Sequence, residues 1–266
     1  MKEFFGFGDY TRPAEGFLSW QHITFVTTLL VIMMALAIIF GHINRNKDEK
    51  TKNKVLIVSA ILIDSVELFK ILIMYLRATD TFELRDVLPL FLCSLQLVTI
   101  PLAAFSKGRI KEAALDFVFI FGLLGAVLGT YGAGQNYDCY PVFSIDNVAS
   151  GITHCISGFA SLYIAISGMA SMKRKNIHIT FSIIGIFSIV AYTCGALLDK
   201  NYMFLFAGDG TPYDIVFNLV KGNPIAYPIA VILLFVIYIA IFYTAYFFAT
   251  SKKRRHAKSV LLSDKT

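Results

Sequence analysis

Long apolar runs are the feature that most constrains what this sequence can fold into. Seven of them cover residues 20–43, 55–77, 87–105, 110–131, 149–172, 177–198 and 225–249. About 20 apolar residues in a helix cross the hydrocarbon core of a bilayer, where backbone polar groups must be paired within the segment. Only 16% of the residues are charged, against about a quarter in soluble domains. The sequence therefore predicts an all-α polytopic membrane bundle with seven transmembrane helices.

The basic residues are distributed unevenly between the two sides of this predicted bundle. Seventeen of them lie in the first, third and fifth loops and after residue 249, whereas six lie before residue 20 and in the other loops. By the positive-inside rule, the N-terminus is outside and the C-terminus is inside. This predicts an extracytoplasmic segment at 1–19, a transmembrane domain at 20–249 and a basic cytoplasmic tail at 250–266. We expect a multi-pass protein of a cell membrane.

The net charge of +6 comes largely from these loops and from the sequence KKRRHAK in the tail. Basic clusters beside a membrane bind anionic headgroups, so the expected partners are membrane lipids and not nucleic acid. The four cysteines, Cys93, Cys139, Cys155 and Cys194, show no CxxC spacing. The sequence thus signals neither a disulfide framework nor a zinc site, and we expect no metal and no other cofactor.

Three charged residues interrupt the apolar run at 55–77, namely Asp64, Glu67 and Lys70. A spacing of three residues places them along one helix face, where Glu67 and Lys70 can form an ion pair. Charges at membrane depth are costly and normally face the interior of a bundle. Two interpretations are open, a structural ion pair or part of a binding site.

A thiol, an amide and an imidazole lie at similar depth in two other runs. The run at 87–105 carries Cys93 and Gln96 three residues apart, hence on one helix face. In the run at 149–172, His154 begins a stripe of small residues on which another helix can pack closely. Cys93 and His154 each lie about six residues, or ~9 Å, inside the predicted outer surface. Their matching depth predicts a pocket in the outer half of the bundle.

Two further polar residues lie near the same predicted surface. His22 lies at the outer entry of the first run, and Asn201 lies just beyond the outer end of the sixth. Together with Gln96, Glu67 and Lys70, they are candidates for binding a substrate.

A thiol beside an imidazole points to acyl transfer. His154 can take the thiol proton, so that Cys93 attacks an ester and forms an acyl thioester. Gln96, or backbone N–H groups near the start of its helix, can stabilise the oxyanion, and a lipid hydroxyl or water then accepts the acyl group. The residues therefore predict a membrane-embedded lipid acyltransferase or acyl hydrolase.

Two interpretations from other classes stay open. In a transporter or lipid-binding protein, Asp64, Glu67, Lys70 and His154 form a polar pathway or a headgroup site, and Cys93 is a packing residue. A polar face that continues to the inner side favours the transporter, but the inner halves of the later runs carry few charges. A structural assembly protein without a small ligand is the third interpretation.

Four segments carry a resemblance to a known family: LPLFLCSLQL at 88–97, ITHCISG around His154, NYMFL at 201–205, and the spacing Gly222…Pro224…Tyr227. In their order and spacing they resemble the bacterial YwaF family of membrane proteins, which is related to the eukaryotic transmembrane protein 164 family. The resemblance covers most of the chain.

The resemblance implies a seven-helix membrane protein, and it implies that the membrane is a bacterial plasma membrane. Through the eukaryotic relatives, it also implies a lipid acyltransferase that moves a fatty acyl chain between phospholipids. Matched residue by residue, the implied nucleophile is Cys93 and the implied base is His154. Phe91 departs from the pattern, because many bacterial relatives carry a histidine at that position.

Overall fold

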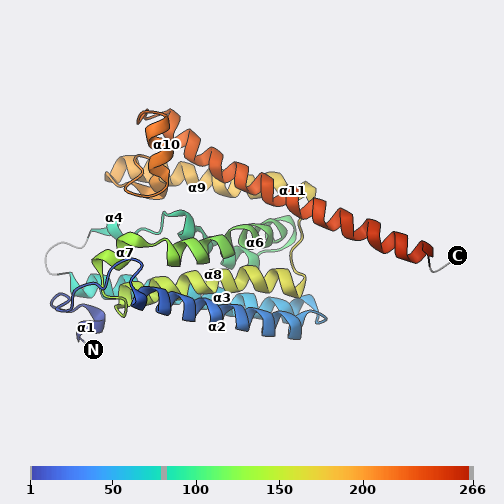
Figure 1. The fold of residues 1–266 in the computed structure, drawn as a ribbon, viewed down its shortest axis with the longest axis horizontal. Helices are drawn as coiled ribbons and strands as arrows, with labels where there is room; N and C mark the ends of the chain where they lie inside the picture. Colours follow the sequence, from blue (N-terminus) through green and yellow to red (C-terminus); the bar gives the residue numbers. More distant parts are fainter. Residues whose placement is uncertain (1, 79–82, 264–266) are drawn as a thin grey trace. The chain divides into compact units, whose positions relative to one another are not determined.

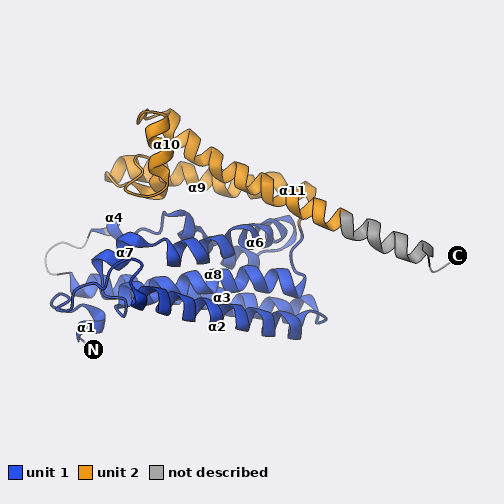
Figure 2. Cartoon of the chain, viewed as in Figure 1, with its two compact units in different colours: residues 1–171 blue, residues 172–266 orange. Residues whose placement is uncertain are grey.

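The computed structural model describes residues 2–78 and 83–263, with the backbone alone at Leu84 and at 252–263. The chain divides into two compact units, residues 1–171 and residues 172–266 (Figure 2). Every regular element in the described residues is helical. The expected all-α architecture is therefore confirmed, and each unit is described separately below.

Four long helices form the body of the first unit: α2 (Trp20–Asn44), α3 (Glu49–Arg77), α6 (Gly108–Tyr131) and α8 (Ile145–Ser167). They run side by side, and α8 packs against the other three (Figure 1). The shorter α5 (Gln96–Phe105) packs on α3 and α6. Three short elements, α1 (Lys2–Phe5), α4 (Leu84–Val87) and α7 (Gly134–Cys139), complete the unit together with a 3-10 turn described below.

The contact between α6 and α8 depends on the stripe of small residues. A Cβ atom on Gly122 would lie 2.6 Å from the carbonyl oxygen of Ser157, so only glycine permits this approach. The Ser157 hydroxyl donates to the carbonyl of Gly122 at 3.3 Å, and the Ser161 hydroxyl donates to that of Phe119 at 2.8 Å. The predicted packing role of these small residues is confirmed.

The apolar run at 87–105 does not form one helix. α4 ends at Val87, residues 88–91 are non-helical, and a 3-10 turn, η1 (Leu92–Leu95), leads into α5. Pro89 contributes to the break, because the residue before a proline is pushed towards extended geometry, and Leu88 has ψ 126°. Pro101 lies inside α5, which continues as one helix to Phe105.

Within the described residues, five helices are long and apolar enough to cross a membrane: Trp20–Asn44, Gly108–Cys139, Ile145–Ser167, Arg174–Leu198 and Ala226–Ser251. The prediction of seven spans is therefore wrong. The run at 55–77 lies in the 29-residue α3, but Asp64, Glu67 and Lys70 interrupt its apolar stretch. The run at 87–105 leaves the helical segment Leu92–Phe105, about 21 Å long and too short for a hydrocarbon core of about 30 Å.

The second unit contains α9 (Ile177–Leu198), α10 (Tyr213–Leu219), α11 (Ala226–Ser263) and two 3-10 turns, η2 (Arg174–Asn176) and η3 (Tyr202–Phe204). α9 packs on α11, and a hydrogen bond of 3.1 Å joins their Thr180 and Tyr243 hydroxyls. The backbone of α11 continues without interruption through the expected boundary at residue 249. The side chains of the expected basic tail at 252–266 lie outside the described residues.

Candidate functional site

Cys93 lies in the first turn of the helical segment that follows the break. Phe91 precedes this turn in extended geometry, and its side chain makes no capping hydrogen bond. The Cys93 side chain is half-buried, and the backbone N–H of the next residue, Ser94, donates to the carbonyl of Phe91 at 3.0 Å. The start of a helix favours negative charge, because its first N–H groups have no partner within the helix. The sequence alone did not reveal this position, because the run reads as one continuous helix.

His154 projects from α8 onto a glycine face of α6. A Cβ atom on Gly129 would lie 2.0 Å from Cε1 of the imidazole, so the ring occupies the space that a side chain would fill. Gly129 therefore provides the space that the half-buried His154 ring occupies.

Lys70 of α3 is linked electrostatically to both candidates. The positive charge of Lys70 acts on both the Cys93 thiol and the His154 imidazole, which belong to two other elements. Lys70 also forms an ion pair of 2.6 Å with Glu67, and the two side chains are 21% and 14% exposed. Asp64 lies one turn further back on α3 and is half-buried. Among the described residues, no group of three or more acidic, histidine or cysteine side chains is arranged to hold a metal.

Gln96 begins α5 and is 2% exposed. Its Oε1 accepts a hydrogen bond of 3.0 Å from the hydroxyl of Thr99, which is completely buried. Its Nε2 is buried and finds no hydrogen-bond partner in the described structure. A buried amide donor without a partner is uncommon, since burial costs free energy unless a hydrogen bond replaces the lost water.

His22 is completely buried and uses both ring nitrogens within the protein. The backbone N–H of Leu18 donates to Nδ1 at 3.1 Å, which leaves the proton on Nε2 to bond the carbonyl of Thr130 at 3.1 Å. The ring packs on Tyr137 with a centroid separation of 3.9 Å. These contacts join α2, α6 and α7, and each ring nitrogen of His22 has a hydrogen-bond partner within the protein. A contact between His22 and a substrate stays a prediction.

Asn201 belongs to the second unit, where it folds the loop after α9. Its Nδ2 donates to the carbonyl of Ala207 at 2.7 Å and to Oδ2 of Asp209 at 2.6 Å. Its Oδ1 accepts from the backbone N–H of Phe206 at 2.9 Å. All three bonds stay within residues 201–209, and the predicted role of Asn201 in substrate binding is untested.

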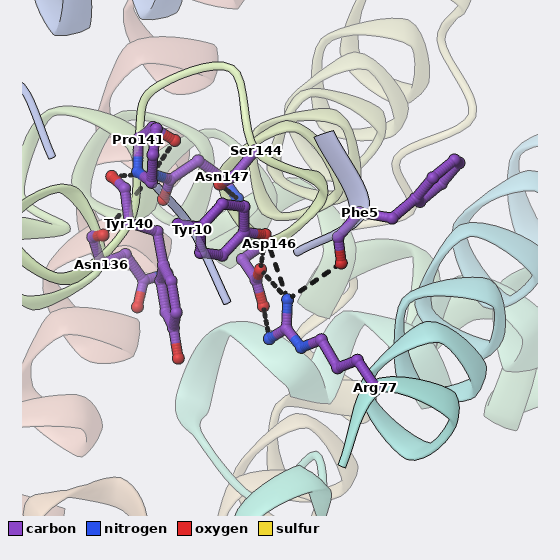
Figure 3. Close-up of polar contacts among 9 residues, drawn as sticks. All are labelled: Phe5, Tyr10, Arg77, Asn136, Tyr140, Pro141, Ser144, Asp146 and Asn147. Atoms are coloured by element: carbon purple, nitrogen blue, oxygen red, sulfur yellow. Dashed lines mark hydrogen bonds and ion pairs between the residues drawn. The ribbon is translucent and has the colours of Figure 1, made fainter. Parts of the chain in front are cut away.

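A buried ion pair at one end of the first unit was not predicted from the sequence (Figure 3). The two guanidinium nitrogens of Arg77 donate to the two carboxylate oxygens of Asp146, each at 2.6 Å. The Tyr10 hydroxyl donates to the same carboxylate at 2.7 Å and accepts from Arg77 at 3.1 Å. Burial, together with the hydrogen bond to Asp146, raises the pKa of Tyr10. The guanidinium carbon lies 5.8 Å from the ring centroids of both Tyr10 and Tyr140.

This ion pair determines how α3 and α8 align. Arg77 is the last residue of α3 and Asp146 is the second residue of α8, so the two antiparallel helices are joined where one ends and the other begins. Lys70 lies seven residues back along α3, or ~10 Å, and His154 lies eight residues forward along α8, or ~12 Å. The pair therefore holds Lys70 and His154 at nearly the same level.

The comparisons with known proteins identify the family. A search of the curated proteins and of the solved structures finds no match to this chain. The profile of the TMEM164 family matches residues 17–246, which include the broken helix, the His154 segment and most of the second unit. The bacterial YwaF name stays a prediction. Since the match covers most of the sequence, the chain belongs to the TMEM164 family of membrane proteins.

Proposed function

We propose that this protein is a membrane-embedded lipid acyltransferase or acyl hydrolase in which Cys93 is the nucleophile and His154 is the base. One observation carries the proposal: Cys93 lies at the start of a new helical segment after the break at 88–91, where backbone N–H groups without partners favour a thiolate. The TMEM164 family is linked to lipid acyltransferase activity, which supports the same reaction class.

The reaction proceeds in two halves. His154 takes the thiol proton while the Cys93 sulfur bonds to the carbonyl carbon of a lipid ester. The tetrahedral intermediate collapses, the C–O bond to the lipid alkoxide breaks, and His154 returns the proton to that oxygen. The acyl thioester on Cys93 then transfers its acyl group to a second lipid hydroxyl, or to water, which loses its proton to His154.

The break in the helix before Cys93 supports this assignment. Inside a membrane, non-helical backbone is tolerated only where protein covers it or where it lines a cavity. The break at 88–91 exposes the first N–H groups of a new helix, and Cys93 lies among them. Such groups stabilise both a thiolate and the oxyanion formed when it attacks an ester. Phe91, the residue that departs from the family pattern, is the last extended residue before this turn.

The charged residues of α3 fit a lipid substrate. Lys70 and Glu67 offer a positive and a negative group within the same neighbourhood, which suits a polar headgroup. The excess of basic residues in the loops and tail places the N-terminus outside and the C-terminus inside in this proposal. Substrate enters from the surrounding lipid on the N-terminal side.

The test uses the full chain in phospholipid vesicles that contain a phosphatidylcholine with a fluorescent acyl chain. We expect the label to move to a second lipid or to free fatty acid, and Cys93→Ala and His154→Ala to abolish this movement. Cys139→Ala is the matched control, because Cys139 is exposed. Full activity in folded Cys93→Ala protein would overturn the assignment.

The Glu67–Lys70 ion pair favours a second candidate, a lipid-binding protein or transporter. An ion pair at membrane depth costs free energy, and such pairs usually serve a function; binding a polar lipid headgroup would be one. In that case Glu67→Gln and Lys70→Met would abolish binding of a fluorescent phospholipid, and Cys93→Ala would leave binding unchanged. Acyl transfer that depends on Cys93 would exclude this candidate as the main function.

A further inference from the structure

We propose that the side-chain amide of Gln96 binds the carbonyl oxygen of the acyl group that Cys93 attacks, and so forms one donor of an oxyanion hole. This inference rests on the proposed function and identifies a further residue of its reaction. It begins with the Nε2 group of Gln96, which is buried and has no hydrogen-bond partner among the described residues. A donor held dry and unpaired is available to a ligand oxygen.

The position of Gln96 directs this donor towards the thiol. Gln96 follows Cys93 by three residues, at the point where η1 passes into α5. Residues three apart eclipse one another in a 3-10 turn, so Cys93 and Gln96 share one face. Cys93 is also the second residue of this helical segment, where backbone N–H groups have no partner within the helix. An ester carbonyl attacked there has a backbone donor on one side and the Gln96 amide on the other.

Thr99 determines which end of the amide is available. Its hydroxyl donates to Oε1 of Gln96 at 3.0 Å, and the hydroxyl is completely buried. This bond uses the carbonyl end of the side chain and leaves both Nε2 hydrogens free. Thr99 is therefore a positioning residue, because it acts on the substrate only through Gln96.

In this reaction Gln96 only donates a hydrogen bond to the oxyanion and transfers no proton. When the Sγ–C bond forms, the carbonyl π electrons move to oxygen, and this negative oxygen needs donors until the C–O bond to the leaving alkoxide breaks. Gln96 gives up no proton, since His154 carries the proton from the thiol to the alkoxide. An oxyanion donor is preorganised, so its removal affects the transition state more than the binding of substrate.

The experiment compares two reactions of the same thiol in full-length protein in vesicles. The first is acylation of Cys93 by phosphatidylcholine with a fluorescent acyl chain, detected as hydroxylamine-labile label on the Cys93 peptide. The second is alkylation of Cys93 by iodoacetamide, in which a C–S bond replaces a C–I bond and no oxyanion forms. Mass spectrometry of the Cys93 peptide separates this thiol from the other three.

We expect Gln96→Met to slow acylation by about 10²-fold or more, as for other oxyanion donors, and to leave the alkylation rate unchanged. Methionine has a similar length and no donor, so this variant also removes an unpaired buried polar group. It also removes the acceptor of the buried Thr99 hydroxyl, so we expect its melting temperature to stay near that of the original protein or to fall by a few degrees. Thr99→Val, which keeps the amide but releases it, is expected to lower the acylation rate less, and Thr99→Ser is expected to preserve it.

Three results would overturn the inference. Acylation of Gln96→Met at the original rate would show that the amide is not needed. Equal losses of acylation and alkylation in both Gln96→Met and Thr99→Val would show that Gln96 only supports the fold around the thiol. Absence of label on Cys93 in the original protein would remove the proposed function itself, and this third result is recognisable without any Gln96 variant.

Discussion

Arg77, the last residue of α3, and Asp146, in the first turn of α8, form a bidentate ion pair. Its two hydrogen bonds are each 2.6 Å long. The side chains are 14% and 8% exposed, and the residues are 69 positions apart in the sequence. Because α3 carries Lys70 and α8 carries His154, this pair brings these two residues to nearly the same level along the bundle.

Breaking this pair on one side should destabilise the protein strongly. Arg77→Leu leaves the Asp146 carboxylate buried without its main partner, which typically costs about 3–5 kcal/mol. We expect a large fall in melting temperature in detergent, together with a fall in acyl transfer as α3 shifts against α8. The exchanged double variant Arg77→Asp/Asp146→Arg should recover part of both losses. If Arg77→Leu were as stable as the original protein, the buried ion pair would not contribute to stability as expected.

Tyr10 should make the stability of the N-terminal segment sensitive to alkaline pH. Burial and the hydrogen bond to Asp146 raise its pKa, so the folded state holds the proton more tightly than the unfolded state. The stabilisation is complete below the unfolded pKa of about 10 and is lost as the pH rises above that value. Tyr10→Phe should flatten this alkaline loss, as followed by melting temperature between neutral and alkaline pH. An unchanged alkaline slope in Tyr10→Phe would assign the loss to other groups, such as Tyr140.

Gly129→Ala should displace His154 without changing any polar group. The added Cβ would lie 2.0 Å from the imidazole, so the ring must leave its present position. We expect acyl transfer to fall by about 10²-fold, the order of loss expected when a catalytic group moves by about 1 Å. Gly125→Ala is the matched control on the same face, because its Cβ would meet only the Ser157 hydroxyl, at 4.0 Å. A loss of activity in the control but not in Gly129→Ala would contradict this placement of the ring.

His22→Leu should reduce stability and leave the chemistry intact. The substitution leaves the backbone N–H of Leu18 and the carbonyl of Thr130 without their partner, at about 1–3 kcal/mol for each buried group left unpaired. We expect a lower melting temperature but an unchanged rate of Cys93 acylation for each folded molecule. A specific loss of acylation, with stability preserved, would instead support the prediction that His22 contacts substrate.

Some elements could be predicted from local sequence because their cause is local. The apolar run at 177–198 has the same bounds as α9, and the run at 20–43 is one residue shorter than α2, since length and apolarity alone favour a buried or lipid-facing helix. The Glu67–Lys70 ion pair followed from a spacing of three residues on one helix. The relation to the transmembrane protein 164 family also followed from short segments in order, and the family match confirms that relation, whereas the YwaF name stays a prediction.

The candidate site could be predicted from local sequence only in part. Hydropathy averages over a window, so it treated residues 87–105 as one span and missed the break that puts Cys93 at the start of a helix. It also gave no sign that Arg77 would find Asp146, because each residue lies at the edge of its run and looks like an ordinary interfacial charge. Depth along a helix was predictable, but the rotation of each helix about its axis was not.

The sequence by itself determined that this chain is helical, lies in a membrane and belongs to its family, because apolar length and residue spacing act over a few turns of one segment. The tertiary structure decided which polar side chains meet. It joined α3 to α8 through Arg77 and Asp146, seated His154 against Gly129, and left the Gln96 amide buried without a partner. Those outcomes depend on packing between residues far apart in the sequence, where shape and burial select one arrangement among many with the same periodicity.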